Sequence, residues 1–219
     1  MAAPTEQITL YTAKICPYAQ RTEIALAEAG VDYTRFEIDL GNKPEWYASK
    51  INPASKPTAA PVPASQPSPL STKLAESLVL LEFLSDIHPT IPSLLPRDPV
   101  KRARARFFID AVSTKFVPAF YKFQVLGEKE AVGGLMEGVE SVMRLLPSLE
   151  GKAEGENGIK EGQGGQEIDP GPFVLGPNFS IADAAIAPFA LRWELSLSND
   201  IGAYEEGEGM RGLGSIWRL

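Results

Sequence analysis

The spacing of hydrophobic and polar residues near the start of the chain predicts a β–α–β unit. Hydrophobic residues alternate with polar ones over residues 7–12, which is typical of a strand. A helix is expected over residues 16–29, because Pro17 suits the first helical position and Gly30 suits the position just past the end. Alternation returns over residues 34–39 and predicts a second strand. Two strands joined by one helix in this way lie parallel.

The rest of the chain changes from mixed patterns to helical ones. Residues 52–72 are rich in Pro, Ala and Ser, so we expect loops there with one short strand around Val62. Residues 151–172 are rich in Gly, Glu and Gln and predict a mobile loop. Helices are expected over residues 76–86, 100–125, 135–149 and 180–193, with Pro118 and Pro188 inside the second and the last.

These patterns together predict two domains. The α/β domain is expected over residues 1–88 and the all-α domain over residues 100–219, and both lengths are ordinary for domains. Four prolines fall within residues 89–99, which favours a linker at that place.

Charge and hydropathy exclude several classes of protein. The net charge of the 219 residues is −7, whereas domains that bind nucleic acid usually carry a basic surface. The hydrophobic run over residues 78–81 is interrupted by Glu82, so it is far shorter than the roughly 20 residues that cross a bilayer. The first residues do not have the pattern of a signal peptide. We therefore expect a cytoplasmic protein with neither a nucleic-acid partner nor stable membrane insertion.

The candidate chemistry centres on Cys16, the single cysteine of the chain. This residue follows a predicted strand and precedes Pro17, which places it at a helix N-terminus. Unpaired N–H groups and the helix dipole favour a thiolate at such a position, and no histidine base is needed. The single histidine, His88, lies at a predicted helix end and is not expected to be catalytic. The alternative is that Cys16 is a small buried hydrophobic residue.

The surroundings of Cys16 narrow the type of reaction. A dithiol redox protein needs a second cysteine three residues further on, and that position is Ala19. A mixed disulfide on Cys16 must therefore be released by an outside thiol, and glutathione is the abundant thiol of the cytosol.

Two other dipeptides have the properties that a glutathione site needs. Ser77 and the N–H groups of a helix start can bind the γ-glutamyl carboxylate, while Glu76 can accept from the ammonium group. The alternative is that these two residues only mark the helix start. Val62-Pro63 is a candidate cis peptide bond, which would turn the backbone of Val62 outward to pair with an extended peptide.

The same motifs resemble those of a known family. The motifs are Ile15-Cys16-Pro17-Tyr18-Ala19-Gln20-Arg21, Asn42-Lys43-Pro44-Glu45-Trp46-Tyr47, Asn52-Pro53, Val62-Pro63, Glu76-Ser77 and Ser180-Ile181-Ala182-Asp183. They occur in the order seen in omega-class glutathione transferases, and the resemblance spans most of residues 7–193. The last motif looks like that superfamily's helix-capping motif, in which we expect Ser180 to cap the N–H of Asp183 while Asp183 reaches back.

The resemblance implies a thioredoxin-like domain followed by an all-helical domain. It implies Cys16 as the nucleophile, Tyr18 beside it and Pro63 as a structural cis-proline. The implied glutathione-binding residues are Tyr18, Leu40, Lys43, Val62, Glu76 and Ser77, with Lys43 on the glycyl carboxylate. The implied activities are thiol transfer, dehydroascorbate reduction and removal of glutathione from conjugates. Glutathione is the expected co-substrate, no metal is expected, and homodimers are usual in the family.

The second-substrate site is predicted from hydrophobic residues of the helical part. Phe120, Phe123 and Trp193 are the candidates to line it, and packing within a core is the alternative for them. Arg192 is a further candidate, because the resemblance places it where omega-class proteins carry an arginine. The function best predicted is a glutathione-dependent thiol transferase or deglutathionylating reductase. A non-catalytic ligandin-type carrier of hydrophobic or aromatic small molecules is the second hypothesis. A third is a relative of the chloride intracellular channel proteins, which carry a similar Cys-Pro motif.

Overall fold

The computed structural model describes residues 8–51, 58–59, 71–88, 94–146 and 171–198. Within the chain, two compact units are distinguished by their internal contacts. The first comprises Met1–Arg97 with Ala184–Phe189, and the second comprises Asp98–Asp183 with Ala190–Leu219. The predicted domain boundaries, 1–88 and 100–219, stay a prediction, and the two units are described one after the other.

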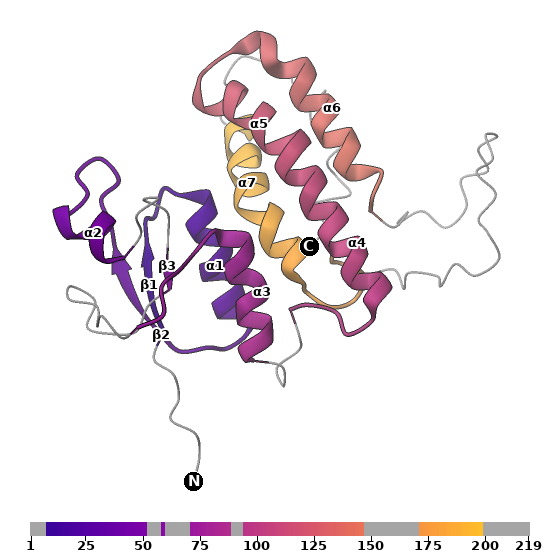
Figure 1. Ribbon diagram of the computed structural model, residues 1–219. Coiled ribbons are helices and arrows are strands. Elements are labelled where there is room, and N and C mark those ends of the chain that lie inside the picture. The colour runs from indigo at the N-terminus through magenta and orange to yellow at the C-terminus, as the bar shows by residue number, and fades with distance from the viewer. Residues whose placement is uncertain (1–7, 52–57, 60–70, 89–93, 147–170, 199–219) are drawn as a thin grey trace, which may run out of the picture. The chain divides into compact units, whose positions relative to one another are not determined.

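The first unit is built on a four-stranded sheet (Figure 1). Its strands are β1 Ile8–Thr12, β2 Tyr33–Glu37, β3 Thr58–Ala59 and β4 Leu74–Ala75, in the order β2-β1-β3-β4. β1 and β2 are parallel, which confirms the predicted β–α–β unit, whereas β3 is antiparallel to both β1 and β4. The helices of this unit are α1 Pro17–Glu28, α2 Glu45–Lys50 and α3 Ser77–Ile87. α1 and α3 pack together on one side of the sheet, and α2 lies on the other (Figure 1).

The start and the end of α1 are set by Pro17 and Gly30, the two residues from which the sequence predicted them. Pro17 occupies the first helical position, where its missing N–H costs nothing. At the other end Gly30 has φ +61°, a left-handed conformation that favours glycine. The N–H of Gly30 donates to the carbonyl of Ala27, and the N–H of Val31 donates to that of Leu26, both at 3.0 Å. These two bonds form a Schellman motif and satisfy carbonyls at the helix end.

Helix α2 is held by aromatic packing. It has only six residues, too few to be stable alone. Trp46 and Tyr47 lie with their ring centroids 6.1 and 6.3 Å from that of Tyr11 on β1, and Phe36 on β2 joins the same cluster. The cluster fixes α2 and the loop before it against the carboxyl end of β1. The sequence patterns did not predict this helix.

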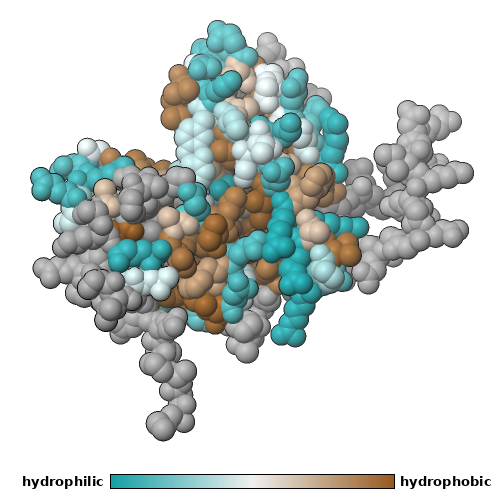
Figure 2. Space-filling model, in the orientation of Figure 1, coloured by the Kyte–Doolittle hydropathy of each residue, from teal (hydrophilic) through white to brown (hydrophobic). Residues whose placement is uncertain are grey.

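The second unit consists of helices. They are α4 Pro99–Ala111, η1 Val112–Phe116, α5 Val117–Phe120, η2 Tyr121–Val125, η3 Lys129–Ala131, α6 Val132–Met143 and α7 Ile181–Ser198, of which Ala184–Phe189 belongs to the first unit. α4, η1, α5 and η2 follow one another along one long helix, and α6 packs beside α4 and α5 (Figure 1). Asp98 caps α4 by accepting from the N–H of Lys101 at 2.8 Å. Figure 2 shows mostly hydrophilic residues at the end of this unit where α6 begins.

The helix that contains Pro118 continues through the proline instead of ending there. The N–H of Val117 bonds to the carbonyl of Val112, and the N–H of Leu126 bonds to that of Tyr121, each five residues back along the chain. Both are π-helical bonds, and the two π segments flank the short α-helix that holds Pro118. A proline removes one donor from the helix, and wider turns on either side accommodate the loss.

The start of α7 is capped by a buried network around Asp183. The Ser180 N–H and hydroxyl donate to Asp183 Oδ2 at 2.9 and 2.7 Å, and the N–H of Val174 donates to Oδ1 at 2.8 Å. The expected back-bond from Asp183 is confirmed, but the Ser180 hydroxyl accepts from the N–H of Ala182 at 3.3 Å and not from that of Asp183. Burial raises the pKa of Asp183, and the bonds from Val174 and Ser180 act in the opposite direction.

The predicted class, an α/β part followed by an all-α part, is confirmed. Several predicted features lie outside the described residues, namely the strand around Val62, the residues 147–170 that include most of the predicted mobile loop, and part of the linker. No helix of the described ranges is both long and hydrophobic enough to span a bilayer.

Gly138 allows α6 to approach η1, and we expect substitution there to destabilise the fold. A Cβ at this position would lie 2.9 Å from the carbonyl oxygen of Lys115 and 3.0 Å from the Cα of Phe116, both backbone atoms. Gly138→Ala is therefore expected to lower the free energy of unfolding by about 1–3 kcal/mol in urea titrations. Gly134→Ala on the same helix is the matched control, because its Cβ meets nothing within 4 Å, and it is expected to raise stability by about 0.5–1 kcal/mol. Equal effects of the two substitutions would contradict the close approach.

Candidate active site

A pocket of about 510 Å³ lies in the first unit. Its lining residues come from the ends of β1 and β2, the start of α1, α2 with the loop before it, and the β4–α3 junction. They are Tyr11, Thr12, Ala13, Cys16, Tyr18, Ile38, Leu40, Lys43, Tyr47, Glu76 and Ser77. Among them are six residues that the sequence predicted for catalysis or for glutathione, namely Cys16, Tyr18, Leu40, Lys43, Glu76 and Ser77.

Cys16 is the N-cap residue of α1. Its φ and ψ are −88° and 110°, which is extended backbone, and its side chain makes no capping hydrogen bond. The thiol is free and partly exposed. The Cys16 N–H donates to the carbonyl of Ala13 at 2.9 Å, so a tight turn connects β1 to the helix. At this place the first N–H groups of the helix have no partner within the helix, and negative charge is favoured.

The loop that carries Leu40 and Lys43 is shaped by Asp39. Its Oδ1 accepts from the N–H groups of Gly41 and Asn42 at 2.8 and 3.3 Å, which forms an Asx turn after β2. The turn leaves Leu40 40% exposed at the pocket. Lys43 lies two residues before the start of α2 and supplies a cation to the same pocket.

Glu76 and Ser77 meet the pocket with an unusual backbone. Glu76 has φ 73° and ψ 108°, and it alone among the described non-glycine residues has a positive φ. A non-glycine residue in such a conformation costs of order 1–3 kcal/mol, and such residues cluster at functional sites. Ser77 begins α3 and is 7% exposed. The strained residue therefore places a carboxylate and a hydroxyl side by side at one wall of the pocket.

An arginine lies directly behind this wall. Arg21 is 2% exposed, and its Nη1 donates to Ser77 Oγ at 3.4 Å. Its Nε donates to the carbonyl of Ala185 at 2.8 Å. The guanidinium carbon lies 5.3 Å from the ring centroid of Tyr18 and 4.8 Å from that of Phe189. The sequence analysis did not single out Arg21 for any role.

Other predicted site residues lie elsewhere. Val62 and Pro63 are outside the described residues, so their roles and the cis bond stay predictions. Phe120, Phe123 and Trp193 belong to the second unit and are 1%, 4% and 2% exposed. Phe120 and Trp193 both stack near Phe116, with ring centroids 5.9 and 5.7 Å away. Their burial favours core packing, and the acceptor-site role of these three residues and of Arg192 stays a prediction.

The pocket also contains residues that the sequence analysis missed, among them Tyr11, Thr12 and Ile38. They lie at the carboxyl ends of β1 and β2. Parallel strands end at one edge of a sheet, and ligands bind beside that edge, so the predicted β–α–β unit already contained the signal. Burial raises the pKa of Tyr11, so its phenol stays protonated at neutral pH.

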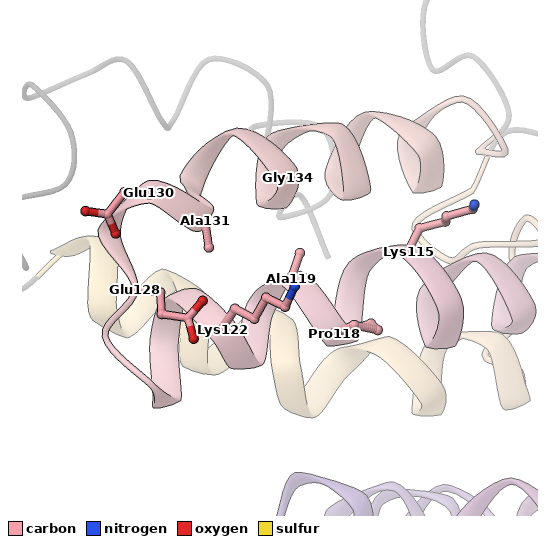
Figure 3. A pocket seen from close by; sticks show the side chains of 8 residues that line it. All are labelled: Lys115, Pro118, Ala119, Lys122, Glu128, Glu130, Ala131 and Gly134. Carbon is pink, nitrogen blue, oxygen red and sulfur yellow. The ribbon is translucent and has the colours of Figure 1, made fainter.

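A second pocket of about 420 Å³ lies in the helical unit (Figure 3). Its charged lining residues are Lys115, Lys122, Glu128 and Glu130. All four are exposed, and in Figure 3 the side chains of Lys115 and Glu130 extend away from the centre of the group. This pocket contains none of the residues predicted for the site.

The chain is similar to known proteins over most of its length. Residues 10–93 match the family model of the glutathione S-transferase N-terminal domain. Glutathione S-transferase omega-1 of Mus musculus is 31% identical over 181 residues, which cover 83% of this chain and 69% of the mouse protein. The solved glutathione transferase Omega 1C of Trametes versicolor is 50% identical with a TM-score of 0.75, covering 96% of this chain and 80% of that one.

This chain belongs to the omega-class glutathione transferases. The resemblance of its motifs to that class is thereby confirmed, and so is the fold of a thioredoxin-like domain with a helical one. A further relative of this omega-class transferase is Omega 2S of Trametes versicolor, solved in complex with 2,4-dihydroxybenzophenone. It is 39% identical with a TM-score of 0.76, covering 98% of this chain and 86% of that one.

The strain at Glu76 in this transferase predicts opposite effects on stability and on binding. Glycine adopts a positive φ without steric strain, whereas alanine at position 76 keeps the strain. Glu76→Gly is therefore expected to be about 1 kcal/mol more stable than Glu76→Ala. Both variants lose the carboxylate and are expected to bind glutathione more weakly than the wild type.

The matched control for this comparison is Glu137, an exposed residue inside α6. There the order should reverse, with alanine about 1 kcal/mol more stable than glycine. Urea unfolding and calorimetric titration with glutathione measure the two effects. The same order at both positions would argue against strain at Glu76.

Proposed function

We propose that this protein catalyses glutathione-dependent thiol transfer with Cys16 as the nucleophile. The observation that carries the proposal is the pocket in which a free cysteine at a helix start lies together with Lys43, Glu76 and Ser77. These groups suit the two ends of the glutathione tripeptide. A cation faces the glycyl carboxylate, while a hydroxyl and a carboxylate face the γ-glutamyl carboxylate and ammonium groups.

The reaction proceeds in two exchanges. The Cys16 thiolate attacks the glutathione sulfur of a mixed disulfide, which releases the acceptor as a thiolate and leaves a disulfide between Cys16 and glutathione. A second glutathione, as thiolate, attacks its bound counterpart and frees Cys16 together with oxidised glutathione. One disulfide is reduced and one is formed, so electrons balance without a metal or a second protein cysteine.

The other residues that the sequence predicted for the site have proposed roles as well. Tyr18 and Leu40 border the bound tripeptide beside Cys16, and the backbone of Val62, preceding a cis Pro63, pairs with its cysteinyl part. The acceptor is proposed to lie near Arg192, Phe120, Phe123 and Trp193. Homodimerisation, cytoplasmic location and activity toward dehydroascorbate remain predictions from the family.

Replacement of Cys16 by serine tests the nucleophile. A serine hydroxyl cannot form a disulfide, so Cys16→Ser is expected to reduce thiol transfer by at least about a thousandfold, measured with a glutathionylated small molecule as substrate. Binding of glutathione to the variant, measured by calorimetry, serves as the control for an intact pocket. Full activity in a variant that still binds glutathione would refute the assignment.

A second candidate function is the carriage of hydrophobic aromatic molecules. The Omega 2S relative solved with 2,4-dihydroxybenzophenone favours it. The carrier hypothesis expects this compound to bind the wild type and Cys16→Ser with equal affinity, and it expects no thiol transfer by the wild type. Turnover by the wild type at rates that depend on Cys16 would favour the enzyme.

A further inference from the structure

We propose that Arg21 is a positioning residue that gives the pocket its preference for a carboxylate at the γ-glutamyl end of the ligand. The inference rests on the proposed function, because it assumes that glutathione binds beside Ser77. Arg21 does not line the pocket, so it acts through residues that do.

The direction of the hydrogen bond between Arg21 and Ser77 determines what the serine hydroxyl can do. A guanidinium group only donates, so Ser77 Oγ must accept in its contact with Arg21 Nη1. The hydroxyl hydrogen of Ser77 is then left for another acceptor, and within the described part of the chain no side chain or carbonyl accepts from it. Because Ser77 lines the pocket, a ligand carboxylate is the acceptor that this arrangement suits.

The charge of Arg21 also bears on which ligands bind. Arg21 is 2% exposed, and a guanidinium group stays protonated in proteins. Its charge therefore acts from a site that water screens poorly, one side chain behind the position proposed for the carboxylate. A neutral ligand group at that position would gain nothing from the charge, so Arg21 discriminates between ligands and does not merely strengthen binding.

The side chain of Arg21 is held rigidly. The guanidinium group is fixed by the 2.8 Å bond from Nε to the carbonyl of Ala185 and by contact with the rings of Tyr18 and Phe189, which also pack edge-on against each other. Tyr18 and Arg21 are three residues apart on α1, so they share one helix face. Arg21 thus connects two lining residues of the pocket, Tyr18 on α1 and Ser77 on α3, and holds both in place before a ligand arrives.

The test compares two peptides. One is glutathione, and the other is γ-aminobutyryl-cysteinylglycine, which keeps the amine but lacks the γ-glutamyl α-carboxylate. Calorimetry gives the ratio of their dissociation constants for each variant of the full chain. The wild type is expected to prefer glutathione by at least about tenfold, the range of a hydrogen bond to a charged group.

The variants separate a positioning role from a structural one. Arg21→Gln is expected to remove most of the preference by weakening glutathione alone, and Arg21→Lys, which keeps the charge, is expected to retain most of it. Ser77→Ala should remove the preference as well, and the double variant should lose no more than either single one. Arg35→Gln, which removes a cation from β2 away from the pocket, is the matched control and should leave the ratio unchanged.

The possible results distinguish failure of the Arg21 role from failure of the proposed function. If Arg21→Gln weakens both peptides equally, or changes neither, the positioning role is refuted while the proposed function stands. If the wild type binds neither peptide at millimolar concentration, the proposed function fails and this inference fails with it. If Arg21→Gln does not fold, nitrogen NMR of the wild-type guanidinium groups decides. Glutathione should shift the Arg21 resonances and the shorter peptide should not, and equal shifts would overturn the proposal.

Discussion

The parallel pairing of β1 with β2 determines where the chemistry of this protein can take place. The pairing continues past the strands, since the N–H of Ile38 donates to the carbonyl of Thr12 at 2.7 Å. Both strands therefore end at one edge of the sheet. The chain leaves β1 through the turn at Ala13 into the start of α1, and it leaves β2 through the Asx turn at Asp39. Cys16 and Lys43 reach the same pocket because their strands end together.

The wall of the pocket formed by Glu76 and Ser77 includes groups whose placement costs free energy of folding. Glu76 has a backbone conformation that favours glycine, and Arg21 is a charged residue with almost no exposure to water. Buried arginines are tolerated when their donors are used, and two donor atoms of Arg21 are used in this way, Nη1 on Ser77 and Nε on the carbonyl of Ala185. Proteins retain such strain and such burial mainly where function requires them. The two costs meet at Ser77, the residue to which the proposed function assigns ligand recognition on that side.

Much of the first unit was predictable, and the exceptions have physical reasons. Alternating residues, Pro17 and Gly30 define β1, α1 and β2 because local geometry alone requires those residue types. Helix α2 escaped prediction because its stability comes from the aromatic cluster around Tyr11 and not from its own six residues. The positive φ of Glu76 has no sequence signal, because glycine would be expected there.

In the site, too, residues within local motifs were predictable, whereas a residue whose contacts are distant in the sequence was not. Six of the predicted residues line the pocket, and they belong to short local motifs that could be recognised in the sequence. Arg21 was not predicted, because an arginine on a helix usually lies in water, and its partners Ser77 and Ala185 are 56 and 164 residues away along the chain. Thr12 and Ile38 were missed although the β–α–β unit already indicated the edge of the sheet where they lie.

Mass spectrometry of the chain with oxidised glutathione tests the central claim most directly, because Cys16 is the single cysteine in the sequence. We expect one glutathione adduct that reduced glutathione removes. The adduct should form at least about a hundredfold faster on the folded chain than on the chain unfolded in urea, since only the fold brings the helix start and the pocket to the thiol. Equal rates for the folded and unfolded chain would show that the fold does not activate this thiol.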